Sequence, residues 1–220
     1  MAEMMNNQGS EIEEVISRSE DFVTKYKWHL LGAIAAIVLI VVGVIYYNKY
    51  TNEKEDEASA AFAKAWEMVD NDMDEQALNG DSISAGLIKL IDQYSGTDQA
   101  DLAKVRAAQA YVKLGKFQEA IPLIEGFDKG DQMITPAVKG MLGECYANVG
   151  QIDKAIDTFK KAAKMASNNS VSPHYLIEAG LLLESQGKKA DALKLYQEVK
   201  EKYINSMYYQ EIDKSIERVK

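Results

Sequence analysis

The residues with spacing closest to that of a metal site are four aspartates. Asp70, Asp72 and Asp74 alternate with other residues, and Asp81 stands at position twelve of the same stretch. A calcium loop needs a glycine where Glu75 stands and a bidentate glutamate where Asp81 stands. We therefore interpret the segment as a solvated acidic linker between two helices and predict neither a metal ion nor a cofactor.

Nucleophilic and zinc chemistry also lack the residues they need. The sequence holds one cysteine, Cys145, and two histidines, His29 and His174, far apart along the chain. A zinc site takes about four ligands, and free cysteine is among the most often buried residue types. We interpret Cys145 as a core residue and His174 as a surface or groove residue. We predict that the protein is not an enzyme; a carboxylate site in a groove is the remaining catalytic alternative.

Composition sets the fold class and disfavours one class of partner. The chain has 34 acidic and 25 basic side chains, a net charge of -9, and no block of five basic residues. Nucleic-acid phosphates bind to clustered Lys and Arg, so we predict no nucleic-acid partner. Ala, Leu, Ile, Lys and Glu are abundant and only three prolines occur, which favours an all-α fold.

An uncharged apolar run extends over residues 30–47. As a helix it would span about 27 Å, close to the hydrocarbon thickness of a bilayer. Aromatic residues, which membrane interfaces favour, stand at both ends: Tyr26 and Trp28 before the run, then Tyr46, Tyr47 and Tyr50. The run is longer than the apolar region of a cleaved signal peptide. We predict an uncleaved transmembrane helix over residues 29–50, in contact with the lipid through residues 30–47.

Flanking charges predict the orientation of this helix. Cytoplasmic flanks carry the excess of Lys and Arg, and here three basic residues precede the run while two follow it: Arg18, Lys25 and Lys27, then Lys49 and Lys54. We predict that residues 1–28 are cytoplasmic and that the C-terminal part lies outside; the same protein facing the cytoplasm is the alternative. Ser10 and Glu13 form a capping box, which predicts a short amphipathic helix ahead of the anchor.

Three segments after the anchor repeat around a glycine. Gly115, Gly150 and Gly187 lie 35 and 37 residues apart, each with a small residue seven positions before it and an alanine five positions after it. A glycine that ends one helix and begins the next suits a left-handed cap. The tetratricopeptide repeat has a period of about 34 residues. The third unit departs most, with Leu183 in place of a tyrosine and Lys189 in place of an apolar residue.

The pattern predicts a tetratricopeptide-repeat-like α-solenoid with capping segments. Three repeats fill residues 101–205, a tether and capping helices fill 51–100, and a capping helix fills 206–220. Terminal helices with one polar face are what a solenoid needs at its ends. We predict about nine helices after the anchor and no sheet.

A solenoid presents a concave surface lined by the first helix of each repeat. Val105 and Gly140 stand where repeats that clamp a C-terminal carboxylate carry basic residues, so we predict a groove for a helix or an extended segment instead. By register the candidate partner-binding residues are Val105, Gln109, Val112, Lys113, Met141, Glu144, Asn148, His174, Ile177 and Leu181.

The order of parts resembles the YfgM-type family over essentially the whole chain. An acidic N-terminal helix, an uncleaved anchor and an acidic tether precede an Ala-rich helix with Trp66 and then degenerate repeats. The resemblance implies a bacterial inner-membrane protein, ancillary to the SecYEG translocon. It also implies a periplasmic domain that contacts the translocon and periplasmic chaperones and has no catalytic activity. The alternative is a subunit of another envelope assembly, such as cell division or outer-membrane biogenesis.

Overall fold

The chain is helical wherever the structure, a computed structural model, describes it. The backbone is described for residues 2–82 and 84–220, and the side chains for residues 25–29, 31–82 and 84–220. Within these ranges the β-type pairing is one isolated bridge between Gly80 and Ala85. The helices are α1 (Ala2–Asp70), α2 (Asp74–Asn79), α3 (Leu87–Gln93), α4 (Asp98–Lys113), α5 (Phe117–Ile124), α6 (Ile134–Asn148), α7 (Ile152–Ala166), α8 (Ser172–Ser185), α9 (Lys189–Lys202) and α10 (Ile212–Val219).

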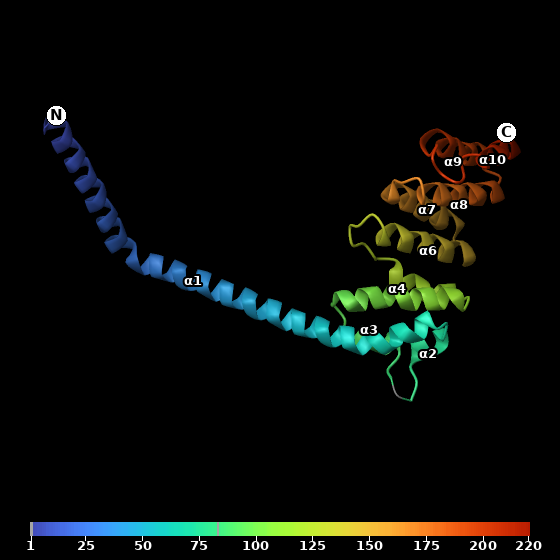
Figure 1. The fold of residues 1–220 in the computed structure, drawn as a ribbon, viewed down its shortest axis with the longest axis horizontal. Helices are drawn as coiled ribbons and strands as arrows, with labels where there is room; N and C mark the ends of the chain where they lie inside the picture. Colours follow the sequence, from blue (N-terminus) through green and yellow to red (C-terminus); the bar gives the residue numbers. More distant parts are fainter. Residues whose placement is uncertain (1, 83) are drawn as a thin grey trace. The chain divides into compact units, whose positions relative to one another are not determined.

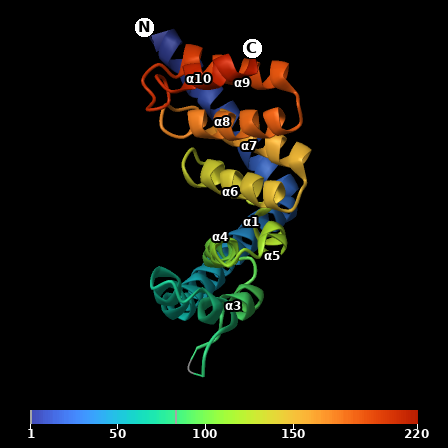
Figure 2. The same cartoon turned by 90° about the vertical axis from the view of Figure 1, so that its right-hand side faces the viewer.

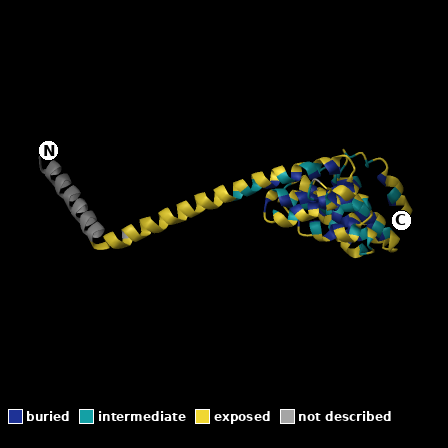
Figure 3. Cartoon of the chain, turned by 90° about the horizontal axis from the view of Figure 1, so that it is seen from below, coloured by how far each residue is buried: buried dark blue, intermediate teal, exposed yellow. Residues whose placement is uncertain are grey.

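The chain divides into two compact units, Met1–Glu53 and Lys54–Lys220. In the first unit the apolar run lies within α1 and its described side chains are exposed, as the yellow part of Figure 3 shows. Leu39 is 72% exposed, whereas leucine is among the residue types most often buried in folded proteins. By length and composition this is one helix that could cross a membrane. The predicted capping box at Ser10 and Glu13 lies outside the residues whose side chains are described.

The second unit is a stack of helical hairpins (Figures 1 and 2). Helices α4 and α5, α6 and α7, and α8 and α9 pair with each other, and each pair packs on the next. Helix α10 packs on α9 and closes the stack at its C-terminal end. The predicted all-α, tetratricopeptide-like solenoid is therefore confirmed.

The three turn glycines share one capping geometry. Their φ angles are 70°, 79° and 74° at Gly115, Gly150 and Gly187. In each turn the next N–H donates back to a carbonyl five residues earlier, as from Lys116 to Tyr111 at 2.8 Å and from Gln151 to Tyr146 at 2.8 Å. This Schellman arrangement requires a left-handed residue, which glycine adopts without steric cost.

Small residues allow the two helices of a repeat to approach closely. A β-carbon at Gly143 would lie 2.9 Å from Cδ1 of Phe159 on α7, too close for unstrained packing. A β-carbon at Gly180 would likewise lie too close to the ring of Tyr196 on α9. Ala108 is fully buried at the matching position of the first repeat. The small residue seven positions before each turn glycine is therefore needed for the helix packing.

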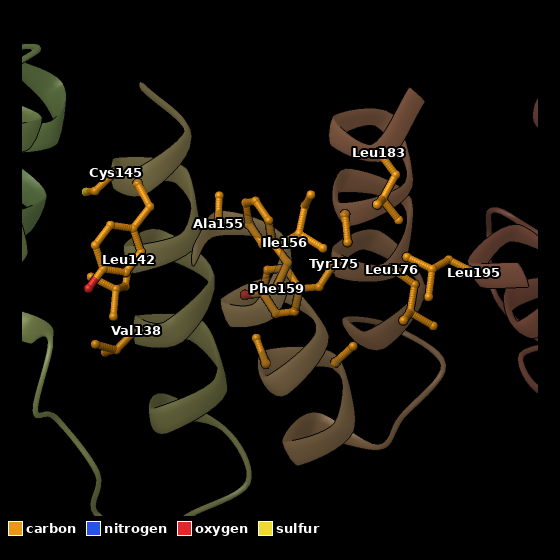
Figure 4. Packing of buried hydrophobic residues seen from close by; sticks show 14 of the residues in the cluster. Val138, Leu142, Cys145, Ala155, Ile156, Phe159, Tyr175, Leu176, Leu183 and Leu195 are labelled. Atoms are coloured by element: carbon orange, nitrogen blue, oxygen red, sulfur yellow. The ribbon is translucent and has the colours of Figure 1, made fainter. Parts of the chain in front are cut away.

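Two hydrophobic clusters form the core of the second unit. The larger one extends from Val105 on α4 to Val219 on α10, and Figure 4 shows its middle, where Phe159 of α7 lies beside Tyr175 of α8. The smaller one joins the end of α1 to α2, α3 and α4. Burying a large apolar side chain such as Phe62 contributes about 2 kcal/mol, and Phe62 is fully buried there. This cluster forms the N-terminal cap.

The acidic segment after the apolar run is part of a helix and makes specific contacts. Glu55 accepts hydrogen bonds from the N–H groups of Asp98 at 2.6 Å and Gln99 at 3.3 Å, at the start of α4. A carboxylate there is stabilised by the free N–H groups and the helix dipole. The segment therefore caps α4.

The predicted solvated linker at residues 70–81 needs correction. It contains α2, a helix too short for a periodic sequence signal, and Asp74 at its start is buried at 7% exposure. Ala77 and Leu78 on α2 are buried in the N-terminal cluster. Burial of these two residues explains why the segment folds onto α4 rather than remaining in solvent.

Candidate partner-binding groove

A groove of about 850 Å³ lies along the first helices of the three repeats. It follows the helices in the order α4, α6 and α8, and the end of α1 closes one end of it. The side chains come from five helices and one turn: Val69, Asp70, Asp72, Arg106, Gln109, Val112, Lys113, Gly140, Met141, Glu144, Phe159, His174, Tyr175 and Glu178. The repeat thus brings residues more than 100 positions apart into one surface.

Six of the ten residues predicted from the repeat register line this groove: Gln109, Val112, Lys113, Met141, Glu144 and His174. Four do not. Val105 is buried in the larger core cluster, and Ile177 is half-buried against the same cluster. Asn148 turns back to donate to the carbonyl of Glu144 at 3.0 Å, and Leu181 is exposed outside the groove.

The register had a signal for two of the residues it missed. Met141 has equivalents 35 residues earlier and 37 residues later, which are Arg106 and Glu178, and both line the groove. Applying the spacings of 35 and 37 residues to every candidate would have identified Arg106 and Glu178. Asp70 and Asp72 carried no such signal, because they precede the repeats and reach the groove through the packing of the N-terminal cap.

Aromatic side chains form part of the groove wall. Gly140 leaves room on α6 for the ring of Tyr175, which a β-carbon at position 140 would meet. Tyr175 stacks with Phe159 at 6.1 Å between ring centroids, and burial raises the pKa of its hydroxyl group. His174 lies 5.4 Å from the Tyr175 ring and 6.3 Å from the Tyr208 ring. This wall is largely aromatic.

The basic side chains of the groove are paired with aspartates at its α1 end. Arg106 Nη1 lies 3.2 Å from Asp70 and Lys113 Nζ lies 2.6 Å from Asp72. The hydrogen bond between Lys113 and Asp72 lowers the pKa of the aspartate and raises the pKa of the lysine. The aspartates singled out in the sequence therefore serve as partners for α4.

Cys145 lies in the core, fully buried, as predicted. Burial raises the pKa of its thiol to about 11, so the nucleophilic thiolate is scarce near neutral pH. Across the described residues, no three His, Cys, Asp or Glu side chains gather as a metal-binding group.

Repeated helical hairpins, each closed by a glycine cap and together lining one concave groove, define an α-solenoid repeat protein. Comparison with known families then identifies the family. Residues 20–213 match the family described as tetratricopeptide repeat-like domain, and the chain belongs to it. Its repeat fold indicates a scaffold for protein–protein interaction.

Solved structures share the fold at low sequence identity. Two structures of nearly identical TPR-like repeats of a putative kinesin light chain from Podosopora anserina superpose with a TM-score of 0.55. Each is 14% identical to this chain and covers 75% of it, while the matched part is 85% and 86% of those chains. A comparison with curated proteins gives no match.

Proposed function

We propose that the protein is a non-enzymatic scaffold, anchored in the bacterial inner membrane, that binds protein partners in the groove of its repeat domain. The groove along α4, α6 and α8 carries the proposal, since it is open, about 850 Å³ in volume and lined by both apolar and charged side chains. Peptide segments and helices bind in grooves of this kind. The exposed apolar stretch of α1 supplies the anchor.

Membrane anchoring supports a scaffold role because it raises the local concentration of the groove near membrane partners. A groove confined near a membrane meets a membrane partner at high effective concentration, which strengthens weak contacts without new ones. The N-in orientation would place the repeat domain in the periplasm, where the translocon and periplasmic chaperones are the proposed partners. In the alternative function, the protein is a subunit of another envelope assembly and binds different partners with the same groove and anchor.

Site-specific photocrosslinking tests the groove. A photoreactive residue replaces Met141, which lines the groove, or Met207, which is 82% exposed and lies outside it. We expect discrete protein adducts from position 141 and few from position 207. Equal labelling from both positions, or none from position 141, would count against a groove-binding scaffold. Copurification in mild detergent then separates the translocon from other assemblies.

A reporter fused after Lys220 tests the orientation. A periplasm-dependent enzyme such as alkaline phosphatase should be active in this fusion, and a cytoplasm-dependent fluorescent reporter should be dark. The reverse result would place the groove in the cytoplasm and rule out the periplasmic chaperones as partners.

A further inference from the structure

The two ends of the groove differ in charge compensation. At the α1 end, Arg106 and Lys113 are occupied by Asp70 and Asp72 at 3.2 Å and 2.6 Å. Lys113 also lies 3.8 Å from Asp74. Ion pairs at these distances leave little positive charge for a ligand at this end.

The other end carries uncompensated negative charge. Glu144 on α6 and Glu178 on α8 line the groove, and neither forms a salt bridge with the side chains that the structure describes. Four carboxylates and two basic groups line the groove in all. With both basic groups already paired, the excess negative charge lies between α6 and α8.

Apolar and aromatic surface lies beside these two carboxylates. Met141 is half-buried next to Glu144 along α6, and Tyr175 stands one turn before Glu178 on α8. Lys and Arg suit such a place, because their aliphatic stems cover apolar surface while their charged ends reach carboxylates.

We propose that the α6–α8 end of the groove binds a partner segment that carries Lys or Arg among apolar residues. The inference rests on the proposed scaffold function and adds the chemical class of the partner. Two carboxylates in one groove, neither in an ion pair with the described side chains, repel an acidic segment and attract a cationic one, and the apolar wall favours a segment with apolar residues over a purely polar one.

Selection from a random peptide library tests the partner class. The full chain, held in micelles of an uncharged detergent, is presented with displayed 12-residue peptides, and the enriched peptides are then tested for binding to the double variant Glu144→Gln/Glu178→Gln. The matched control, Glu119→Gln/Glu201→Gln, removes two exposed carboxylates outside the groove. Thermal unfolding followed by circular dichroism establishes that both variants fold.

We expect the enriched peptides to contain Lys or Arg with apolar residues. Removing each carboxylate should weaken a selected peptide about two- to fivefold, as for partly exposed ion pairs. The affinity should fall with added salt, and the control variant should bind like the wild type.

The possible failures separate the two proposals. Enriched peptides that are acidic or uncharged, and that bind the double variant as tightly as the wild type, would overturn the cationic partner and leave the scaffold in place. No enriched peptide at all would count against both. If the wild-type chain instead dimerises through this end and the Gln variant is monomeric, a second copy covers the groove and the cationic partner is overturned.

Discussion

The ring of Tyr196 on α9 fills the space that a side chain at Gly180 on α8 would occupy. A β-carbon at position 180 would lie 2.7 Å from Cζ of Tyr196 and closer still to Cε1. The tyrosine cannot easily move away, because it is fully buried and its hydroxyl donates to Glu184 one turn further along α8. The glycine is thus required for close approach of two helices.

Gly180→Ala should destabilise the repeat domain. Overpacking a well-filled site costs about 1–3 kcal/mol, and the gain in helix propensity returns about 0.5–1 kcal/mol. We expect a net loss of about 1 kcal/mol in the free energy of unfolding, the middle of the range these two figures allow, measured by chemical denaturation. Gly126→Ala is the matched control, since a β-carbon there meets no atom within 4 Å. Equal stability of the two variants would contradict the packing argument.

Arg218 should stabilise the C-terminal cap in a pH-dependent way. Its Nε and Nη2 atoms both donate to Glu184 at 2.8 Å, which joins α10 to α8. The bond to Arg218 lowers the pKa of Glu184 from its ordinary 4.5. Because the folded pKa is the lower one, the stabilisation is present above about pH 4.5 and is lost as the pH falls through the folded value.

We therefore expect Arg218→Gln to be less stable than the wild type by about 0.5–1 kcal/mol at pH 7, given that the arginine is half exposed. The difference should shrink in acid, as measured by urea unfolding from pH 7 to pH 3. Lys194→Gln is the control, because its pair with Asp191 is exposed and joins residues three apart on α9. A difference that stays constant with pH would argue against the ion pair.

Local rules were enough to predict the repeats, and the same rules failed where long-range packing decides. Gly115 and Gly150 could be placed from spacing alone, since a left-handed cap is a local requirement. The periodic register placed Met141 on the first helix of its repeat, and Met141 lines the groove; its contact with a partner stays a prediction. Val105 follows the same register but is buried in the larger core cluster. Its burial depends on helices distant in sequence, which a local pattern does not show. Asp74 was interpreted as solvated because nothing nearby in sequence covers it.

Asp131 should be required for the start of α6. Its carboxylate accepts bonds from the N–H of Met133 at 2.7 Å and from the hydroxyl of Thr135 at 2.7 Å. The hydrogen bond from the Thr135 hydroxyl, with those from the backbone N–H groups, lowers the pKa of Asp131 to about 2. The stability it provides is present above its ordinary pKa of 3.8 and is lost as the pH falls toward 2.

Asp131→Ala should lower the midpoint of thermal unfolding at pH 7, and Asp131→Asn should lower it less, because asparagine keeps an acceptor oxygen for the N–H groups but loses the charge. Circular dichroism at 222 nm, the usual helix signal, measures both. If the alanine variant unfolds at the wild-type temperature, the cap contributes nothing and the loop before α6 is held by other contacts.

Two charges in the apolar run should abolish membrane attachment if the run is the anchor. Val38 and Leu39 lie near its centre, exposed within α1. An arginine at the centre of a membrane helix costs about 2.5–3.5 kcal/mol, so Val38→Arg/Leu39→Arg should move the chain from the membrane pellet to the supernatant after alkaline extraction.

Met73→Arg/Met207→Arg is the control, because it adds the same charge at exposed positions of the repeat domain. Both proteins should retain the helical signal of the repeats. If the double arginine variant stays in the pellet while the control does too, another part of the chain holds it to the membrane.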